Sequence, residues 1–123
     1  MSDDLARAYV DALGRKDAAA LKALLHPEVD FKALTPRRLF EATSSDQVVD
    51  EIVLGTWFDP GDHIDEVLSV ETDEVVDRRR LAYRLRVTNG DGPHVVEQQA
   101  YLEDDGERIT WMRILCAGYQ PIR

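Results

Sequence analysis

The sequence is poor in cysteine and contains no long hydrophobic run. The one cysteine, Cys116, cannot form an internal disulfide, and because it lies in an apolar segment we expect a buried small hydrophobic residue rather than a nucleophile. Glycine-rich phosphate loops and His or Cys pairs at metal-ligand spacing are also missing, so the sequence predicts no cofactor and no metal site. Without an apolar stretch of membrane-spanning length, the chain is not expected to insert into a membrane.

Positive charge is also scarce. The chain carries 15 Lys and Arg against 24 Asp and Glu, for a formal net charge of -9. A surface with this balance repels the phosphate backbone of nucleic acids. The opening segment MSDDLARAYVDAL is acidic and amphipathic and does not resemble a signal peptide. We therefore expect a cytoplasmic protein with no nucleic-acid or membrane partner.

The length and composition favour one folded domain. The chain has 123 residues, of which 44% are hydrophobic and 32% are charged. A chain of this length buries about two thirds of its unfolded surface around one core. We predict a single domain over residues 1–123.

The first half of the chain carries helical signals. Apolar residues at helical spacing predict a helix over residues 3–13 and a second helix that Asp17 caps and Pro27 ends. A Ser-x-x-Gln capping box at residues 44–47 predicts the start of a third helix, and we expect Gly55 to end it.

The remaining segments have the two-residue alternation of strands. Six strands are predicted, the last three joined by hairpin turns, at residues 29–34, 39–42, 63–72, 79–88, 95–103 and 109–117. This order of parts predicts an α+β fold in which three helices pack on a strongly curved, mainly antiparallel sheet. The expected shape is a cone-shaped α+β barrel with an internal pocket between the helices and the sheet.

The register of the last hairpin decides which side chains face that pocket. If Asp105 and Gly106 form a two-residue turn, Gln99 lies opposite Met112, and the inner face carries Glu97, Gln99, Tyr101, Met112, Ile114 and Cys116. A three-residue loop over residues 104–106 instead turns Val96, Gln98 and Ala100 inward. We favour the first register.

Several polar and aromatic residues are candidates for a site in the pocket. On the favoured register Glu97 is the one carboxylate on an apolar strand face, where burial would raise its pKa toward the range useful for a general base. Alternatively, Glu97 forms an exposed ion pair with Arg84 or Arg86. The residues expected to line the pocket are Tyr9, Trp57, Phe58, Tyr83, Gln99, Tyr101 and Met112.

The chain resembles the nuclear transport factor 2-like superfamily, which includes steroid isomerases and SnoaL-like polyketide cyclases. The resemblance is carried by the opening segment AYVDALGRKDAAALKALLHPEVDF and the closing segment EQQAYLEDDGERITWMRILC. It implies the cone fold and frequent homodimers, but it implies little about the reaction.

The resemblance also suggests roles for individual residues. Tyr9 matches a first-helix tyrosine that donates a hydrogen bond to the developing enolate oxygen in the steroid isomerases. Their catalytic carboxylate has no counterpart here, because Ala33 and its neighbours occupy that place. Their second hydrogen-bond donor falls on Gln98 or Gln99, and a glutamine donates a hydrogen bond but cannot abstract a proton.

Two functional hypotheses follow. The first is a cofactor-independent acid-base enzyme of isomerase or cyclase type, acting on an apolar polycyclic or polyketide-like substrate, with Glu97 as base and Tyr9 and Gln99 as donors. The second is a non-catalytic ligand-binding or accessory domain that has lost the catalytic carboxylate. In both cases a small apolar molecule is the expected ligand.

A homodimer is also predicted. Trp111 and Leu115 share a strand face with Arg113, opposite to Met112, so a monomer would expose a large aromatic and an aliphatic side chain next to each other. Pairing two such sheet faces would cover both residues.

Overall fold

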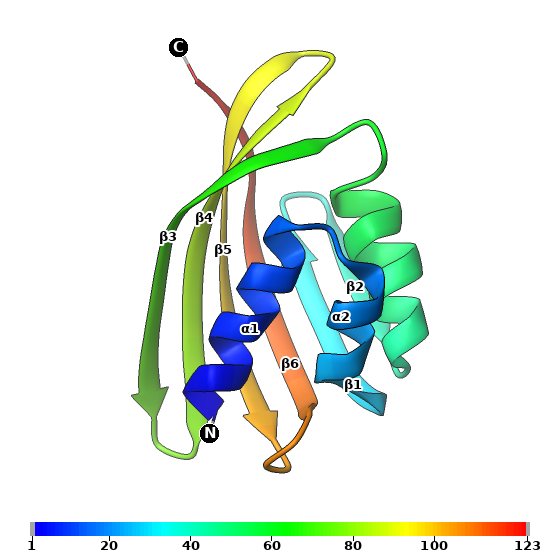
Figure 1. Cartoon of the computed structure of the whole chain (residues 1–123), viewed down its shortest axis with the longest axis vertical. Coiled ribbons are helices and arrows are strands. Elements are labelled where there is room, and N and C mark those ends of the chain that lie inside the picture. The colour runs from blue at the N-terminus through cyan, green and yellow to red at the C-terminus, as the bar shows by residue number, and fades with distance from the viewer. Residues whose placement is uncertain (1, 123) are drawn as a thin grey trace.

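A computed structural model describes residues 2–122 (Figure 1). In chain order, the elements are α1 (Ser2–Gly14), α2 (Ala18–Leu24), β1 (Leu25–Thr35), β2 (Arg38–Ala42), the helix η1 (Gln47–Trp57), β3 (His63–Val75), β4 (Arg78–Asn89), β5 (Gly92–Asp104) and β6 (Ile109–Pro121). The chain is α+β, with helices in its first half and long strands in its second, as the sequence predicted.

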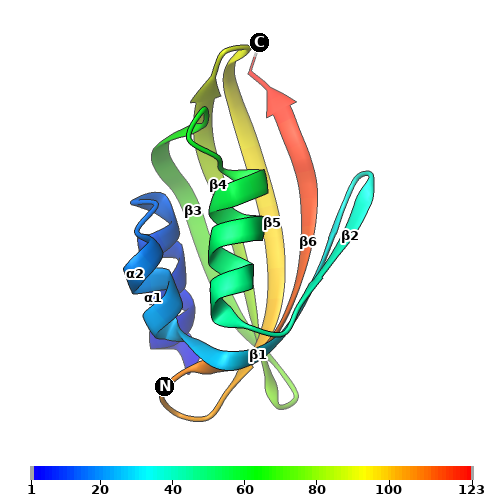
Figure 2. The same cartoon turned by 90° about the vertical axis from the view of Figure 1, so that its right-hand side faces the viewer.

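The six strands form one sheet in the order β2-β1-β6-β5-β4-β3. Neighbouring strands are antiparallel except β1 and β6, which are parallel. All three helices lie on one face of this sheet, which we call the inner face (Figures 1 and 2). Helix α1 packs on β3 and β4, α2 packs on β1, and η1 packs against α2 and β2. We call the opposite, helix-free side of the sheet the outer face.

The core lies between the helices and the inner face. Its largest fully buried side chains include Tyr9 from α1, Phe31 from β1, Tyr83 from β4 and Met112 from β6. On β4 the buried residues alternate with more exposed ones, as the two-residue period of a strand requires. No helix within residues 2–122 has the length and apolar character needed to cross a membrane.

The second helix has its predicted cap but ends earlier than expected. The Asp17 side chain accepts a hydrogen bond from the Ala20 amide at 3.0 Å, and this satisfies a backbone donor that the first helical turn leaves free. Strand β1 begins directly at Leu25, so Pro27 lies inside a strand rather than at a helix end. The pairing of β1 with β6 is interrupted between Leu25 and Asp30, and Pro27, which has no N–H to donate, falls in that interruption.

The third helix extends past its predicted end. The Ser44 hydroxyl accepts a hydrogen bond from the Gln47 amide at 3.2 Å, but Gly55 lies within the helix, which continues to Trp57 as a π-helix. The Phe58 amide accordingly donates to the Val53 carbonyl, five residues back, at 2.8 Å. A Cβ atom on Gly55 would lie 2.2 Å from the Asp50 carbonyl oxygen, so the glycine permits this wide turn instead of ending it.

The favoured register of the β5–β6 hairpin is wrong. The connection is a four-residue loop over residues 105–108, in which the Asp105 carboxylate accepts hydrogen bonds from the Glu107 and Arg108 amides. Gln98 therefore lies opposite Cys116, and Leu102 lies opposite Met112. The longer loop moves the pairing so that Val96, Gln98 and Ala100 are buried, which are the residues that the alternative register placed inside.

Candidate ligand-binding cavity

A cavity of about 220 Å³ lies where the end of η1 meets the β1–β2 turn and strands β5 and β6. Its walls are mostly apolar or aromatic, and the lining residues are Thr35, Pro36, Phe40, Thr56, Trp57, Phe58, Gln98, Cys116, Gly118 and Tyr119. None of these residues is a carboxylate or a histidine. The cavity therefore offers apolar contact and a few hydrogen-bonding groups, but no carboxylate or imidazole that could act as a general base.

Four aromatic side chains give the cavity a fixed wall. Trp57 packs edge-on against Phe40, with ring centroids 5.6 Å apart, and Phe58 packs against Tyr119 at 6.2 Å. The Tyr119 hydroxyl donates to the Trp57 carbonyl oxygen and thereby ties strand β6 to the end of η1. Burial raises the pKa of Tyr119 and the nearby Asp62 carboxylate raises it further, so this hydroxyl keeps its proton at neutral pH.

Gln98 is the polar group at the sheet side of the cavity. It is 1% exposed, and its Oε1 accepts a hydrogen bond from the Tyr83 hydroxyl at 2.5 Å. Its Nε2 has no hydrogen-bond partner within residues 2–122, and the same holds for Trp57 Nε1. A buried donor without a partner destabilises a fold by about 1–3 kcal/mol, and two such donors lie on residues that line this one cavity.

Two buried tyrosines, Tyr83 and Tyr9, place further polar groups in the core behind Gln98. The two tyrosine rings are 6.4 Å apart, and the Tyr9 hydroxyl has no hydrogen-bond partner among the described residues. Burial raises the pKa of both phenols above the ordinary value, so both are protonated donors at neutral pH. Both residues lie inside, as predicted, but neither lines the cavity itself.

Glu97 is not on the inner face. It lies on the outer side of β5, half exposed, and accepts a hydrogen bond from Arg84 Nε at 2.6 Å. This is the exposed ion pair that the sequence left as the alternative. The burial that the favoured register predicted for Glu97 is absent, because the register differs from that one.

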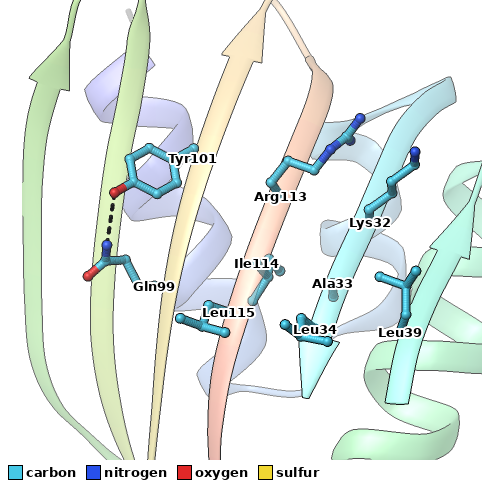
Figure 3. Close-up of a pocket in the computed structure, with 9 residues that line it drawn as sticks. All are labelled: Lys32, Ala33, Leu34, Leu39, Gln99, Tyr101, Arg113, Ile114 and Leu115. Atoms are coloured by element: carbon cyan, nitrogen blue, oxygen red, sulfur yellow. Dashed lines mark hydrogen bonds between the residues drawn. The ribbon is translucent and has the colours of Figure 1, made fainter. Parts of the chain in front are cut away.

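The same register places Gln99 and Tyr101 on the outer face, where Gln99 Nε2 donates to the Tyr101 hydroxyl at 2.9 Å (Figure 3). The prediction that these two residues line the internal pocket is therefore wrong. Met112 does lie on the inner face, but it is fully buried in the core and does not line the cavity. Trp57 and Phe58 line it as predicted.

Sequence reasoning missed the contribution of Tyr119 and Gly118 to the cavity. Both lie beyond residue 117, where the last strand was expected to end, whereas β6 continues to Pro121. The alternation of β6 alone would not have located them, because Gly118 has a φ of +85° and interrupts the regular strand geometry.

The outer face carries a groove of its own, with a volume of about 370 Å³ (Figure 3). Three leucines beside it, Leu34, Leu39 and Leu115, are each more than half exposed. The remaining lining residues are Lys32, Ala33, Gln99, Tyr101, Arg113 and Ile114. The groove is therefore an apolar strip with basic side chains beside it.

Trp111 lies on the outer face, as predicted. The guanidinium carbons of Arg78 and Arg113 lie 4.0 Å and 4.5 Å from the centroid of its ring. Cation–π contacts of this kind cover part of an indole that would otherwise be left in water.

No protein-family model matches the chain, and no curated protein matches it in sequence. Solved structures do match it. A candidate isomerase from Bacillus subtilis has a TM-score of 0.75 at 13% identity, over 92% of this chain and 84% of that one. A ketosteroid isomerase-like protein from Erwinia carotovora atroseptica has a TM-score of 0.60 at 20% identity, over 94% and 93% of the two chains.

An NTF2-like protein of unknown function from Cytophaga hutchinsonii has a TM-score of 0.58 at 14% identity and covers 98% of this chain and 91% of its own. Identities this low show a common fold, and a common fold does not fix a reaction. The chain has the fold of the nuclear transport factor 2-like proteins, which is the resemblance that its opening and closing segments indicated.

Proposed function

We propose that this protein binds a small, mostly apolar molecule that carries a hydrogen-bond acceptor such as a ketone oxygen. The observation that supports this proposal is the buried Nε2 of Gln98, which has no partner within residues 2–122 although Gln98 lines the inner cavity. A carbonyl oxygen at this point would accept the free N–H and offset the penalty of leaving it unpaired. Trp57 Nε1 is a second donor available to the same kind of ligand.

The cavity volume limits the ligand. Pockets for drug-sized molecules have volumes of about 300–1,000 Å³. The inner cavity, at about 220 Å³, is smaller and suits a ligand of one or two rings better than a polycyclic one.

Between the two functional hypotheses, the geometry favours binding without catalysis. An isomerase acting through an enolate needs a base within hydrogen-bond reach of the proton it removes. No carboxylate or histidine lines the cavity to supply such a base, and the candidate Glu97 lies on the other side of the sheet, paired with Arg84. Retention of the donors without the base is the pattern expected of a binding domain derived from an enzyme fold.

Calorimetry with cyclohexanone and with methylcyclohexane, a hydrocarbon of similar size, tests the proposal. The ketone is expected to bind more tightly, and Gln98→Met is expected to remove that preference. Gln99→Met is the matched control, because it changes the neighbouring glutamine on the outer face. Equal affinity for the two probes, or loss of ketone binding in Gln99→Met alone, would contradict the assignment of the site.

A turnover assay distinguishes binding without catalysis from the alternative, an acid-base enzyme. A catalytic protein would exchange the protons next to the ketone carbonyl for solvent deuterium, which NMR follows directly. We expect no exchange above the buffer rate. Exchange that Glu97→Gln lowers by a factor on the order of a hundred would instead establish the acid-base enzyme, with Glu97 as its base.

We propose in addition that the protein is a homodimer in which a second copy covers the outer groove. The exposed leucines Leu34, Leu39 and Leu115 form one apolar strip, and isolated monomers rarely leave such a strip in water. Lys32 beside the groove offers an ion-pair partner to a carboxylate of the second copy.

Sedimentation at micromolar concentration is expected to report twice the mass of one chain, and Leu115→Glu is expected to reduce the particle to one chain. Leu68→Glu is the control, since Leu68 is 44% exposed but does not line the groove. A wild-type protein that sediments as a single chain would refute the dimer.

A further inference from the structure

The single thiol of the protein lies in the inner cavity next to its free amide. Cys116 and Gln98 are directly opposed residues of β6 and β5, and both line the cavity. Directly opposed residues point to the same face of a sheet, with Cβ atoms about 4.5–5.5 Å apart. The thiol and the unpartnered Nε2 are thus neighbours beside one ligand-sized space.

A backbone amide holds the Cys116 thiol at the wall of the cavity. The residue is 8% exposed, and its Sγ accepts a hydrogen bond from the Gly118 amide at 3.4 Å. Cys116 is buried, as the sequence predicted. Unlike an ordinary core cysteine, it also lines a cavity that is large enough for a small ligand.

We infer that Cys116 captures α,β-unsaturated carbonyl compounds covalently, with the carbonyl oxygen held by Gln98 Nε2. This inference rests on the proposed function, because the same amide receives the same ligand oxygen. In such a molecule the electrophilic β-carbon lies one vinyl unit beyond the carbonyl carbon. Cys116 is opposite Gln98 in the sheet and lines the same cavity, so its sulfur is the nucleophile available to that carbon when the ligand oxygen accepts from Gln98.

The reaction balances without a further reactant. The Cys116 thiol loses its proton to water, and the sulfur lone pair forms a C–S bond at the β-carbon. The electron pair of the C=C bond moves toward the carbonyl, and the enolate oxygen that results accepts the Gln98 N–H. Water then returns a proton to the α-carbon, and the product is a thioether in which nothing has been oxidised or reduced. A donor that binds the developing oxyanion accelerates the step.

Intact-protein mass spectrometry with cyclohex-2-enone tests the inference. Because the sequence has one cysteine, we expect one adduct, absent in Cys116→Ser. The labelling rate should saturate with enone concentration, since binding precedes reaction, and excess cyclohexanone should slow it by competition. Gln98→Met should lower the rate about 10- to 100-fold, the scale on which loss of an oxyanion donor acts.

A second variant and a comparison of two ligands distinguish the ways in which the inference could be wrong. Gln98→Leu also removes the donor, and the loss of the unpaired Nε2 offsets the loss of the acceptor for the Tyr83 hydroxyl, so it should slow labelling as Gln98→Met does while leaving the melting temperature near that of the wild type. Cyclohexanone binding without enone capture would overturn the inference and leave the proposed function intact. Labelling that rises linearly with concentration, or that is as fast in Gln98→Met as in the wild type, would show a merely accessible thiol and overturn it as well.

Discussion

The buried pair of Gln98 and Tyr83 predicts that replacing both residues together by apolar ones will not destabilise this protein. In the wild type the Tyr83 hydroxyl donates to Gln98 Oε1, while Gln98 Nε2 has no partner within residues 2–122. If Gln98 Nε2 serves to bind a ligand, the ligand-free protein is destabilised by about 1–3 kcal/mol, because this donor is buried without a partner.

The substitutions Gln98→Leu and Tyr83→Phe allow a double-mutant cycle. Gln98→Leu removes the unpaired Nε2 but leaves the Tyr83 hydroxyl without its acceptor, so the two effects offset each other and the free energy of unfolding should change little. Tyr83→Phe leaves both polar atoms of Gln98 unpaired and should destabilise by about 1–3 kcal/mol. The double variant has no unpaired polar atom left from this pair and should equal or exceed the wild type by up to about 2 kcal/mol.

Urea unfolding at constant pH measures all four proteins, with equal m-values as the check that the unfolding reaction is the same. The matched control is the pair Gln99 and Tyr101, the same residue types hydrogen-bonded on the outer face of the same sheet. Water can replace a hydrogen bond that is lost on the outer face, so the coupling energy between Gln99 and Tyr101 should stay below about 0.5 kcal/mol. A Gln98→Leu/Tyr83→Phe variant less stable than either single variant, or equal couplings in both pairs, would refute the reasoning.

Two other predictions concern stability alone. Gly55→Ala should lower the free energy of unfolding by more than about 2 kcal/mol, because the new Cβ would lie 2.2 Å from the Asp50 carbonyl oxygen. Gly90→Ala is the control and should change the free energy of unfolding little, because Gly90 has open space around it. Thermal melting compares the two variants. The pKa of Asp17 is lowered from 3.8, chiefly by the Ala20 amide, so the stability it contributes is complete above that value and is lost as the pH falls through its lower folded-state pKa. At neutral pH the urea midpoint of Asp17→Asn should therefore lie below that of the wild type. The two midpoints should converge as the pH is lowered below 3.8, and a difference that stays constant with pH would contradict this.

The sequence by itself determined the elements and their class, because these depend on local physics. Asp17 caps the second helix through an amide three residues away, and the alternation along β4 is a property of the strand itself. Trp111 and Met112 lie on opposite faces whatever the partner strand, because neighbouring strand residues always do.

The tertiary structure decided which of these faces meet. The register of β5 against β6 depends on the hydrogen bonds that Asp105 makes in its loop, and a change of one residue there exchanges Gln98 for Gln99 in the interior. The extension of η1 to Trp57 depends on packing that the glycine at position 55 permits but does not dictate.

Apart from Trp57 and Phe58, which the sequence predicted as lining residues, the candidate site belongs to this second category. Phe40, Trp57, Gln98 and Tyr119 come from four elements that are distant along the chain, and no local pattern links them. They meet because β1 pairs in parallel with β6, which brings the β1–β2 turn and the end of β6 beside the last turn of η1. Long-range pairing of this kind is set by the packing of the whole sheet against its helices, and a sequence read segment by segment does not contain it.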